Sequence, residues 1–383
     1  MGLATGANVL ISKRIGAKDE DGTKRAIGTS LTVGLCSGVL LMVIALVFAR
    51  RFLILMNCQP DVLDMATLYM RIYFLGMPVM MLNSFATSVL SASGDSVRPM
   101  AYMIVSGIIN VIANIIFVVA FHMTVEGVAI ATVLSSAVTL TLALIRLLRS
   151  EDICRVRIRY LGIGKGELLE IVRVAVPTCL CSLFFYAANI VYASAVNSLS
   201  TNSMTANAIS GQFDGIIYTV GSAIASATAV MISQNFGAGR FDRLRKVMRV
   251  SVVYVTVVSL CLGVGFVVLA ESMLRILSDD DEVIAIAKDR MTLLCLTYFV
   301  TSIMEVFAFS LRALKRQNST MVVGAVCGFG IRCLWRWMFW PIEPTLSMLF
   351  AGYAVSGFFA IVIYLFVYRR TMNLISLTAV SAE

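Results

Sequence analysis

The chain has 383 residues, of which 59% are hydrophobic and only 14% are charged, and its formal net charge is +9. This composition excludes a soluble globular domain, in which about a quarter of the residues carry a charge. We therefore interpret the chain as an integral membrane protein. Its basic residues are not interleaved with aromatic ones, so the positive charge indicates cytoplasmic loops and anionic lipid rather than nucleic acid.

Apolar stretches of about 20 residues, long enough to cross the hydrocarbon layer as helices, recur along the whole chain. The first residues, 1–12, resemble the second half of such a span. Complete spans are predicted at residues 28–49, 66–91, 100–121, 127–148, 174–197, 205–233, 249–270, 291–311, 320–340 and 346–368. The sequence thus predicts an all-α integral membrane protein.

Lysine and arginine fall in alternate connections between these spans, at residues 13–25, 98, 146–173, 240–249, 312–316 and 369–370. One of the intervening connections is instead the acidic run 279–282. Because loops rich in Lys and Arg stay in the cytoplasm, we expect a multi-pass protein of the inner (cytoplasmic) membrane with a cytoplasmic C-terminus.

The two halves of the chain repeat each other at an offset of 221 residues. Ile11-Ser12 and Gly16-Ala17 match Ile232-Ser233 and Gly237-Ala238, and the segment 90–100 matches 311–321 at the same offset. Each copy holds an even number of spans, so both copies lie the same way up in the membrane. Residue 1 corresponds to Ser222, so we expect the first helix and half of the second to be missing from this chain.

These observations predict two pseudo-symmetric bundles of six helices each, with six spans plus six. The expected domains are an incomplete N-terminal bundle at residues 1–148, a basic cytoplasmic linker at 149–173 and a complete C-terminal bundle at 174–383.

Several segments in this order resemble the MATE (multidrug and toxic compound extrusion) transporters. They are GANVLISKRIGAKDEDGTKRA at residues 6–26, LSASGDSVRPM at 90–100, VPTCLCSLFFYAANI at 176–190 and SQNFGAGRFDRLRK at 233–246. The resemblance covers essentially the whole chain. It implies a secondary antiporter in which inward flow of Na⁺ or H⁺ drives export of organic, often cationic, amphiphilic compounds through a cleft between the two bundles.

Ionisable residues inside membrane spans are functional candidates, because burying them is costly. Asp214, Glu305 and Arg332 are the candidates in the second bundle, and two carboxylates with one guanidinium would leave one negative charge for an exchangeable cation. A buried carboxylate can bind a proton, or pair with Na⁺ where other oxygens converge. Gln212, Asn189 and Tyr218 are candidate neutral oxygen donors. Alternatively, Asp214 forms an inert ion pair with Arg332 that only fixes helix packing.

In the first bundle, Asn110 and Asn114 lie one turn apart, where some members of the resembled family have an Asn and an Asp. An amide at the second position argues against cation coupling in this bundle. Asn110, Asn114 and Asn83 are therefore also interpreted as residues that form hydrogen bonds between helices.

Other functions are disfavoured. The chain has one histidine and neither an HExxH nor a GxSxG motif, so we expect no enzyme, no metal site and no cofactor beyond the coupling ion. The nine cysteines form no CxxC pair and are interpreted as small apolar residues. A flippase for lipid-linked oligosaccharides, of related architecture, is the nearest alternative, although it should present more cationic residues than Arg71, Arg332 and Arg336. We expect a monomer.

Overall fold

The computed structural model describes residues 2–55, 60–150 and 153–380. Every regular element in these residues is a helix, and nine of the helices are long and apolar enough to cross a membrane, or ten if a bent pair counts as one span. The predicted all-α membrane fold is confirmed. The chain divides into two compact units, residues 1–175 and 176–383, which are described separately.

The first unit begins with α1 (Gly2–Gly16) and the long α2 (Glu20–Leu55). It continues through α3 (Pro60–Leu75), α4 (Met77–Ala92), α5 (Val97–Ile115) with a π-helical turn η1 (Ile116–Ala120), and α6 (Val125–Arg149). A short 3₁₀ turn, η2 (Ile158–Tyr160), precedes α7 (Lys165–Asn197), which runs on into the second unit.

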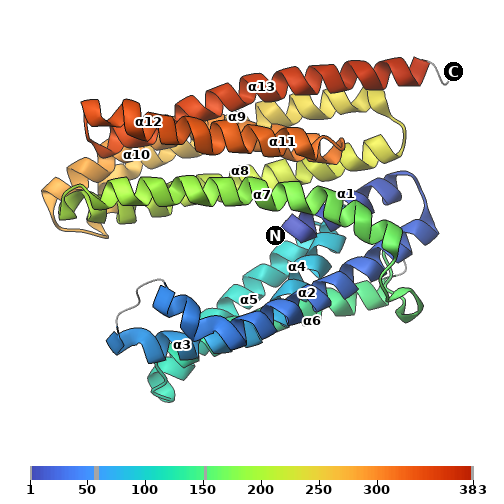
Figure 1. Ribbon diagram of the computed structural model, residues 1–383, viewed down its shortest axis with the longest axis horizontal. Coiled ribbons are helices and arrows are strands. Elements are labelled where there is room, and N and C mark those ends of the chain that lie inside the picture. Colours follow the sequence, from blue (N-terminus) through green and yellow to red (C-terminus); the bar gives the residue numbers. More distant parts are fainter. Residues whose placement is uncertain (1, 56–59, 151–152, 381–383) are drawn as a thin grey trace. The chain divides into compact units, whose positions relative to one another are not determined.

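The second unit contains α8 (Thr201–Gly237), α9 (Phe241–Arg275) and α10 (Asp281–Ala313). A composite helix follows, made of α11 (Gln317–Val323), the π-helical η3 (Gly324–Ile331) and α12 (Arg332–Met338), and a 3₁₀ turn η4 (Trp340–Ile342) leads to α13 (Leu346–Val380). The helices form one bundle in which α10 packs against α8, α9 and α13 (Figure 1).

The helix bounds recur at the 221-residue offset that the sequence predicts. The starts of α2 and α9, at Glu20 and Phe241, are 221 residues apart, as are the ends of α1 and α8, at Gly16 and Gly237. The same offset relates the starts of α6 and α13. The duplication therefore extends from short sequence matches to the elements themselves.

One predicted span, residues 66–91, differs from the expectation of a single straight helix. It belongs to α3 and α4, which meet at Gly76 with a bend of 44°. Pro78 lies in the first turn of α4, where its ring and missing N–H cannot continue the preceding helix. The corresponding positions in α10 are Thr297 and Phe299, which retain the backbone donor, and α10 is continuous.

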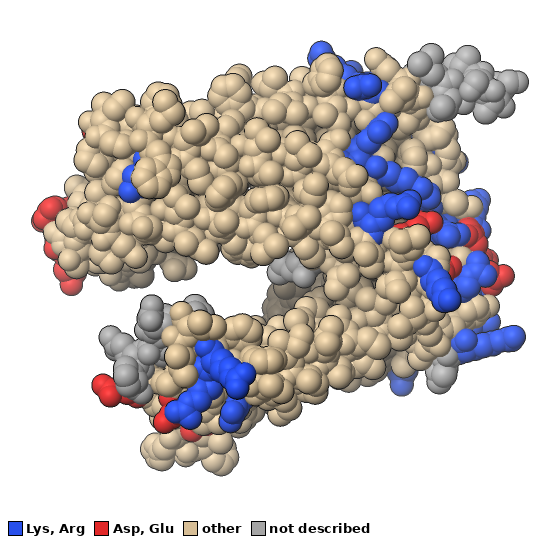
Figure 2. All heavy atoms as spheres, in the orientation of Figure 1, with Lys and Arg blue, Asp and Glu red and all other residues tan. Residues whose placement is uncertain are grey.

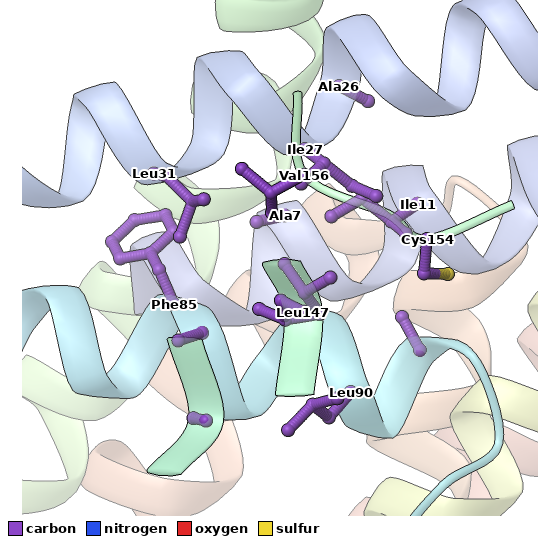
Figure 3. Packing of buried hydrophobic residues seen from close by; sticks show 14 of the residues in the cluster. Ala7, Ile11, Ala26, Ile27, Leu31, Phe85, Leu90, Leu147, Cys154 and Val156 are labelled. Atoms are coloured by element: carbon purple, nitrogen blue, oxygen red, sulfur yellow. The ribbon is translucent and has the colours of Figure 1, made fainter. Parts of the chain in front are cut away.

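The connection after α6 packs onto the first unit. Cys154 and Val156 are buried beside Ile27 and Leu147, in the cluster that also contains Phe85 (Figure 3). The backbone N–H of Val156 donates to the carbonyl oxygen of Leu147 at 3.0 Å. Part of the basic segment predicted as a linker is thus a component of the first core.

Candidate functional site

A cavity of about 330 Å³ lies inside the second unit. Helices α7, α8, α10 and α13 supply its wall, which is rich in aromatic and amide side chains and includes Phe185, Asn189, Tyr192, Asn207, Asp214, Tyr218, Arg290, Tyr298, Phe350 and Tyr353. Gly211 and Gly215 also line it, and a Cβ atom at either position would meet no other atom within 4 Å. The glycines of α8 therefore widen the cavity on both sides of Asp214.

Asp214 is paired with Arg290 across α8 and α10. Its Oδ2 atom accepts a hydrogen bond from Nη2 of Arg290 at 3.1 Å, and its Oδ1 atom lies 3.4 Å from Nη1. The same Nη1 donates to Oγ of Ser210 at 2.8 Å. The side chains of Asp214 and Arg290 are only 13% and 4% exposed, so the pair is screened little by solvent.

The alternative pairing of Asp214 with Arg332 is wrong. Arg332 is 2% exposed, and its Nε atom donates to Oγ of Ser356 at 3.2 Å. Its guanidinium lies 3.8 Å from the centre of the Tyr353 ring. Arg332 is thus held by a hydroxyl and an aromatic face of α13, while the partner of Asp214 comes from α10.

Sequence reasoning missed Arg290 because the apolar window of its span began one residue later, at residue 291. A signal was present: the carboxylate of Asp280 caps α10 by accepting hydrogen bonds from the backbone N–H groups of Glu282 and Val283. An N-cap at Asp280 places Arg290 almost three turns inside the helix rather than in the loop before it.

Aromatic rings that line the cavity contact the guanidinium groups of Arg290 and Arg332. The guanidinium of Arg290 lies 4.3 Å from the centre of the Phe350 ring, in the geometry of a cation–π interaction. Tyr353, which Arg332 covers, donates its hydroxyl to Oδ1 of Asn189 at 2.6 Å. Phe350 thus links α13 to α10, and Tyr353 links α13 to α12 and α7.

Glu305 lies on α10 about 22 Å along the helix from Arg290, at 1.5 Å per residue. It is partly buried, and no hydrogen bond or ion pair to another described residue engages its carboxylate. Arg312 and Tyr218 are close enough to interact with it electrostatically. Because Tyr218 also lines the cavity, it connects the cavity wall to the surroundings of Glu305.

Of the predicted oxygen donors, Asn189 and Tyr218 line the same cavity as Asp214, whereas Gln212 is exposed and is not in its wall. The predicted charge balance is also wrong. The buried basic side chains of the described part of this unit are Arg290, Arg312 and Arg332. Three guanidinium groups with the carboxylates of Asp214 and Glu305 leave an excess positive charge rather than a negative one.

In the first unit, the amide nitrogen of Asn114 donates to the carbonyl oxygen of Asn110 at 2.9 Å and to its Oδ1 atom at 3.1 Å. Asn110 in turn donates to Oγ of Ser135 at 3.3 Å, which links α5 to α6. The Oδ1 atoms of Asn114 and Asn83 are buried without a hydrogen-bond partner among the described residues.

The MatE family model matches residues 1–116 and 177–338. The probable multidrug resistance protein YoeA of Bacillus subtilis (strain 168) is 27% identical over 321 residues, which are 82% of this chain and 69% of that protein. The multidrug export protein MepA of Staphylococcus saprophyticus is 21% identical over 84% of this chain and 71% of its own length.

Solved structures show the same fold. An outward-facing multidrug resistance MATE family transporter of the MOP superfamily superposes with a TM-score of 0.91 at 17% identity, over 98% of this chain and 84% of that one. The MATE transporter VcmN of Vibrio cholerae in its bent form gives 0.89 at 18% identity, over 98% and 85% of the two chains.

Proposed function

The chain belongs to the MatE family, and from this we propose that it is a secondary antiporter that exports small organic, often cationic and amphiphilic, compounds in exchange for Na⁺ or H⁺. It is a multi-pass membrane protein. The family membership and the multidrug exporters among its relatives support export as the direction of transport.

We place the protein in the cytoplasmic membrane as a monomer with its C-terminus in the cytoplasm. In the second unit, Lys and Arg gather at the end where α8 joins α9, and Asp and Glu at the opposite end, where α9 joins α10 (Figure 2). This separation supports the orientation, because basic connections remain on the cytoplasmic side.

The coupling proposal rests on one observation, namely that only one of the two carboxylates makes an ion pair with a described residue. Asp214 already has a cationic partner in Arg290, whereas no ion pair with a described residue neutralises Glu305. A carboxylate inside a bundle that makes no ion pair can bind a proton or Na⁺ without first displacing a guanidinium. Glu305 is therefore the residue at which the driving cation binds.

The aromatic cavity is the part of the second unit that contacts the exported compound. Its volume falls in the range of small-molecule sites, and its wall combines flat apolar surfaces with a few polar groups. Tyr218 contributes to this wall and interacts with Glu305. Cation binding at Glu305 therefore changes the electrostatic environment of the cavity, and the compound must change cation affinity by the same factor.

The test is dye efflux from everted membrane vesicles under an imposed Na⁺ gradient and, separately, an imposed pH gradient. Glu305→Gln is expected to abolish efflux driven by either gradient that supports the wild type. Glu343→Gln is the matched control, because it neutralises an exposed carboxylate in the turn before α13. Full gradient-driven efflux in Glu305→Gln would show that coupling resides elsewhere.

A flippase for lipid-linked oligosaccharides is the second candidate, and the buried arginines favour it. Arg290, Arg312 and Arg332 provide more positive charge inside the second unit than the sequence indicated. A flippase would move a fluorescent lipid pyrophosphate across proteoliposomes while neither gradient drives dye efflux. An antiporter would show the reverse result.

A further inference from the structure

A second cavity of the second unit, about 520 Å³, lies between α9 and α13 near the basic end of the bundle. Its floor is formed by the buried side chains of Met248, Phe307, Tyr368 and Met372. The rings of Phe307 and Tyr368 meet edge to face at 5.9 Å, and the Tyr368 hydroxyl donates to the carbonyl oxygen of Leu244 at 3.4 Å. The floor is therefore apolar and internally satisfied.

Three arginines border this groove. Arg245 and Arg249 lie one turn apart on α9, and Arg369 faces them from α13; all three are exposed. None of them is in an ion pair with a described carboxylate. Three like charges around one groove repel one another unless an anion lies between them, and guanidinium groups match the oxygens of a phosphate.

The 221-residue repeat identifies the positions of the first unit that are equivalent to the three arginines. The positions that correspond to Arg245, Arg249 and Arg369 are Lys24, Gly28 and Leu148, so most of the positive charge is absent there. Lys24 is already paired with Glu20 at 3.0 Å.

The chain itself fills that equivalent groove. The backbone around Tyr160 lies against Gly28 so closely that a Cβ atom at this glycine would collide with the Tyr160 carbonyl oxygen. The backbone N–H of Val156 donates a hydrogen bond to the carbonyl oxygen of Leu147, which is the counterpart of Tyr368 in the repeat. Gly164 donates its N–H to Oγ1 of Thr29 at 3.1 Å. The groove is thus a docking position in the first copy, where the connecting segment covers it. In the second copy the described residues include no segment that covers it.

The surroundings of the open groove favour a lipid as its occupant. The apolar residues Val252, Val253 and Leu365 continue the groove along α9 and α13, away from the arginines. Val253 in the groove and Phe366 beside it are 58% and 67% exposed, as expected of surfaces that face acyl chains. A free phosphate would use the arginines but not this apolar extension.

We propose that the groove binds one anionic phospholipid, with its phosphate between Arg245, Arg249 and Arg369 and an acyl chain along α9 and α13. Basic pockets between transmembrane helices are the sites at which anionic head groups bind. Phe307 on the floor is two residues from Glu305 on α10, so the lipid contacts the helix that carries the proposed cation site.

The test is native mass spectrometry of the full chain in detergent, titrated with phosphatidylglycerol or with phosphatidylcholine of the same acyl chains. One phosphatidylglycerol is expected to bind saturably and in preference to phosphatidylcholine. Each Arg→Gln change at 245, 249 or 369 should weaken this binding about fivefold, since a basic residue at the membrane surface contributes on that order. The triple variant should lose it.

The matched control is Arg243→Gln with Arg370→Gln, which removes exposed charges at the same end of the bundle but outside the groove. It should retain the site. Equal loss in this control, or equal binding of the two lipids, would overturn the proposal in favour of a general surface charge. Displacement of the lipid by millimolar inorganic phosphate would overturn it in favour of a free-phosphate site.

Thermal melting of the same proteins supplies a second readout that does not depend on ion transmission. Phosphatidylglycerol is expected to raise Tm of the wild type and of the control, because a ligand that binds only the folded state stabilises it. The triple variant should melt at the same temperature with and without the lipid. An equal rise of Tm in the triple variant would also overturn the proposal.

Discussion

The pair formed by Asp214 and Arg290 allows a quantitative test of the second unit. At the 3.1 Å separation of Oδ2 and Nη2 and an effective dielectric constant of about 20, the Coulomb attraction is about 5 kcal/mol before desolvation. Desolvation offsets much of this attraction, so removing both charges together costs less than the sum of the two separate losses. Removing one partner leaves a buried charge and costs about 3–5 kcal/mol.

A double-mutant cycle measures this coupling. We expect Asp214→Asn and Arg290→Met each to destabilise the protein by about 3 kcal/mol, and the double variant to lose far less than the sum, with a coupling energy of about 2–3 kcal/mol. The assay is reversible unfolding in mixed micelles with increasing denaturing detergent. Asp214→Asn combined with Arg332→Met is the comparison, because Arg332 is bound to Ser356 and Tyr353 instead.

The cycle has a clear refuting result. A coupling energy below about 0.5 kcal/mol between positions 214 and 290 would mean that the two charges do not meet in the folded protein. A larger coupling energy for Asp214 with Arg332 than with Arg290 would show that Asp214 pairs with Arg332 instead.

Three further predictions concern single contacts. Gly28→Ala should destabilise the protein by about 2 kcal/mol, because its Cβ would collide with the Tyr160 carbonyl, whereas Gly166→Ala, which has open space, should not; melting of both variants checks this. The N–H of Gly22 and the guanidinium of Arg14 hold the pKa of Asp19 below its ordinary value. The stability that this carboxylate contributes is therefore present above pH about 4 and lost as the pH falls through its lowered pKa, so the difference in Tm between wild type and Asp19→Asn should shrink from pH 6 to pH 3. Tyr353→Phe should cost about 1 kcal/mol through loss of the hydrogen bond to Asn189, and Asn189→Ala should add little to it in the double variant.

The sequence predicted the helices well because a membrane span is determined mainly by its own composition. Each predicted span falls on helical residues, although 66–91 is divided between α3 and α4 and 320–340 is a composite of several helical segments. The repeat predicted the matching order of elements in both units. Composition does not report where a single residue interrupts a helix, so the effect of Pro78 at the junction of α3 and α4 was missed. It also placed the start of α10 too late, which hid Arg290.

The contacts of the candidate site were less predictable. Asp214 and Arg290 lie 76 positions apart, and whether they meet depends on the rotation of α8 and α10 about their axes. Hydropathy does not determine that rotation. Arg290 and Arg332 are both basic residues at interior positions of the same bundle, so the sequence alone does not show which of them meets Asp214. The carboxylates could therefore be identified from the sequence, but their partners required the packed helices.

The repeat offers a way to separate structural from functional residues without other sequences. Helix bounds that agree between the copies are properties of the shared scaffold, and side chains that differ at equivalent positions are not required by it. Glu305 corresponds to Ser84, Arg290 to Tyr69 and Arg249 to Gly28. Each of these charges therefore appears in only one of the two copies. A charge inside a membrane span is costly to retain, so the presence of Arg290 and Glu305 in the second unit argues that transport requires them.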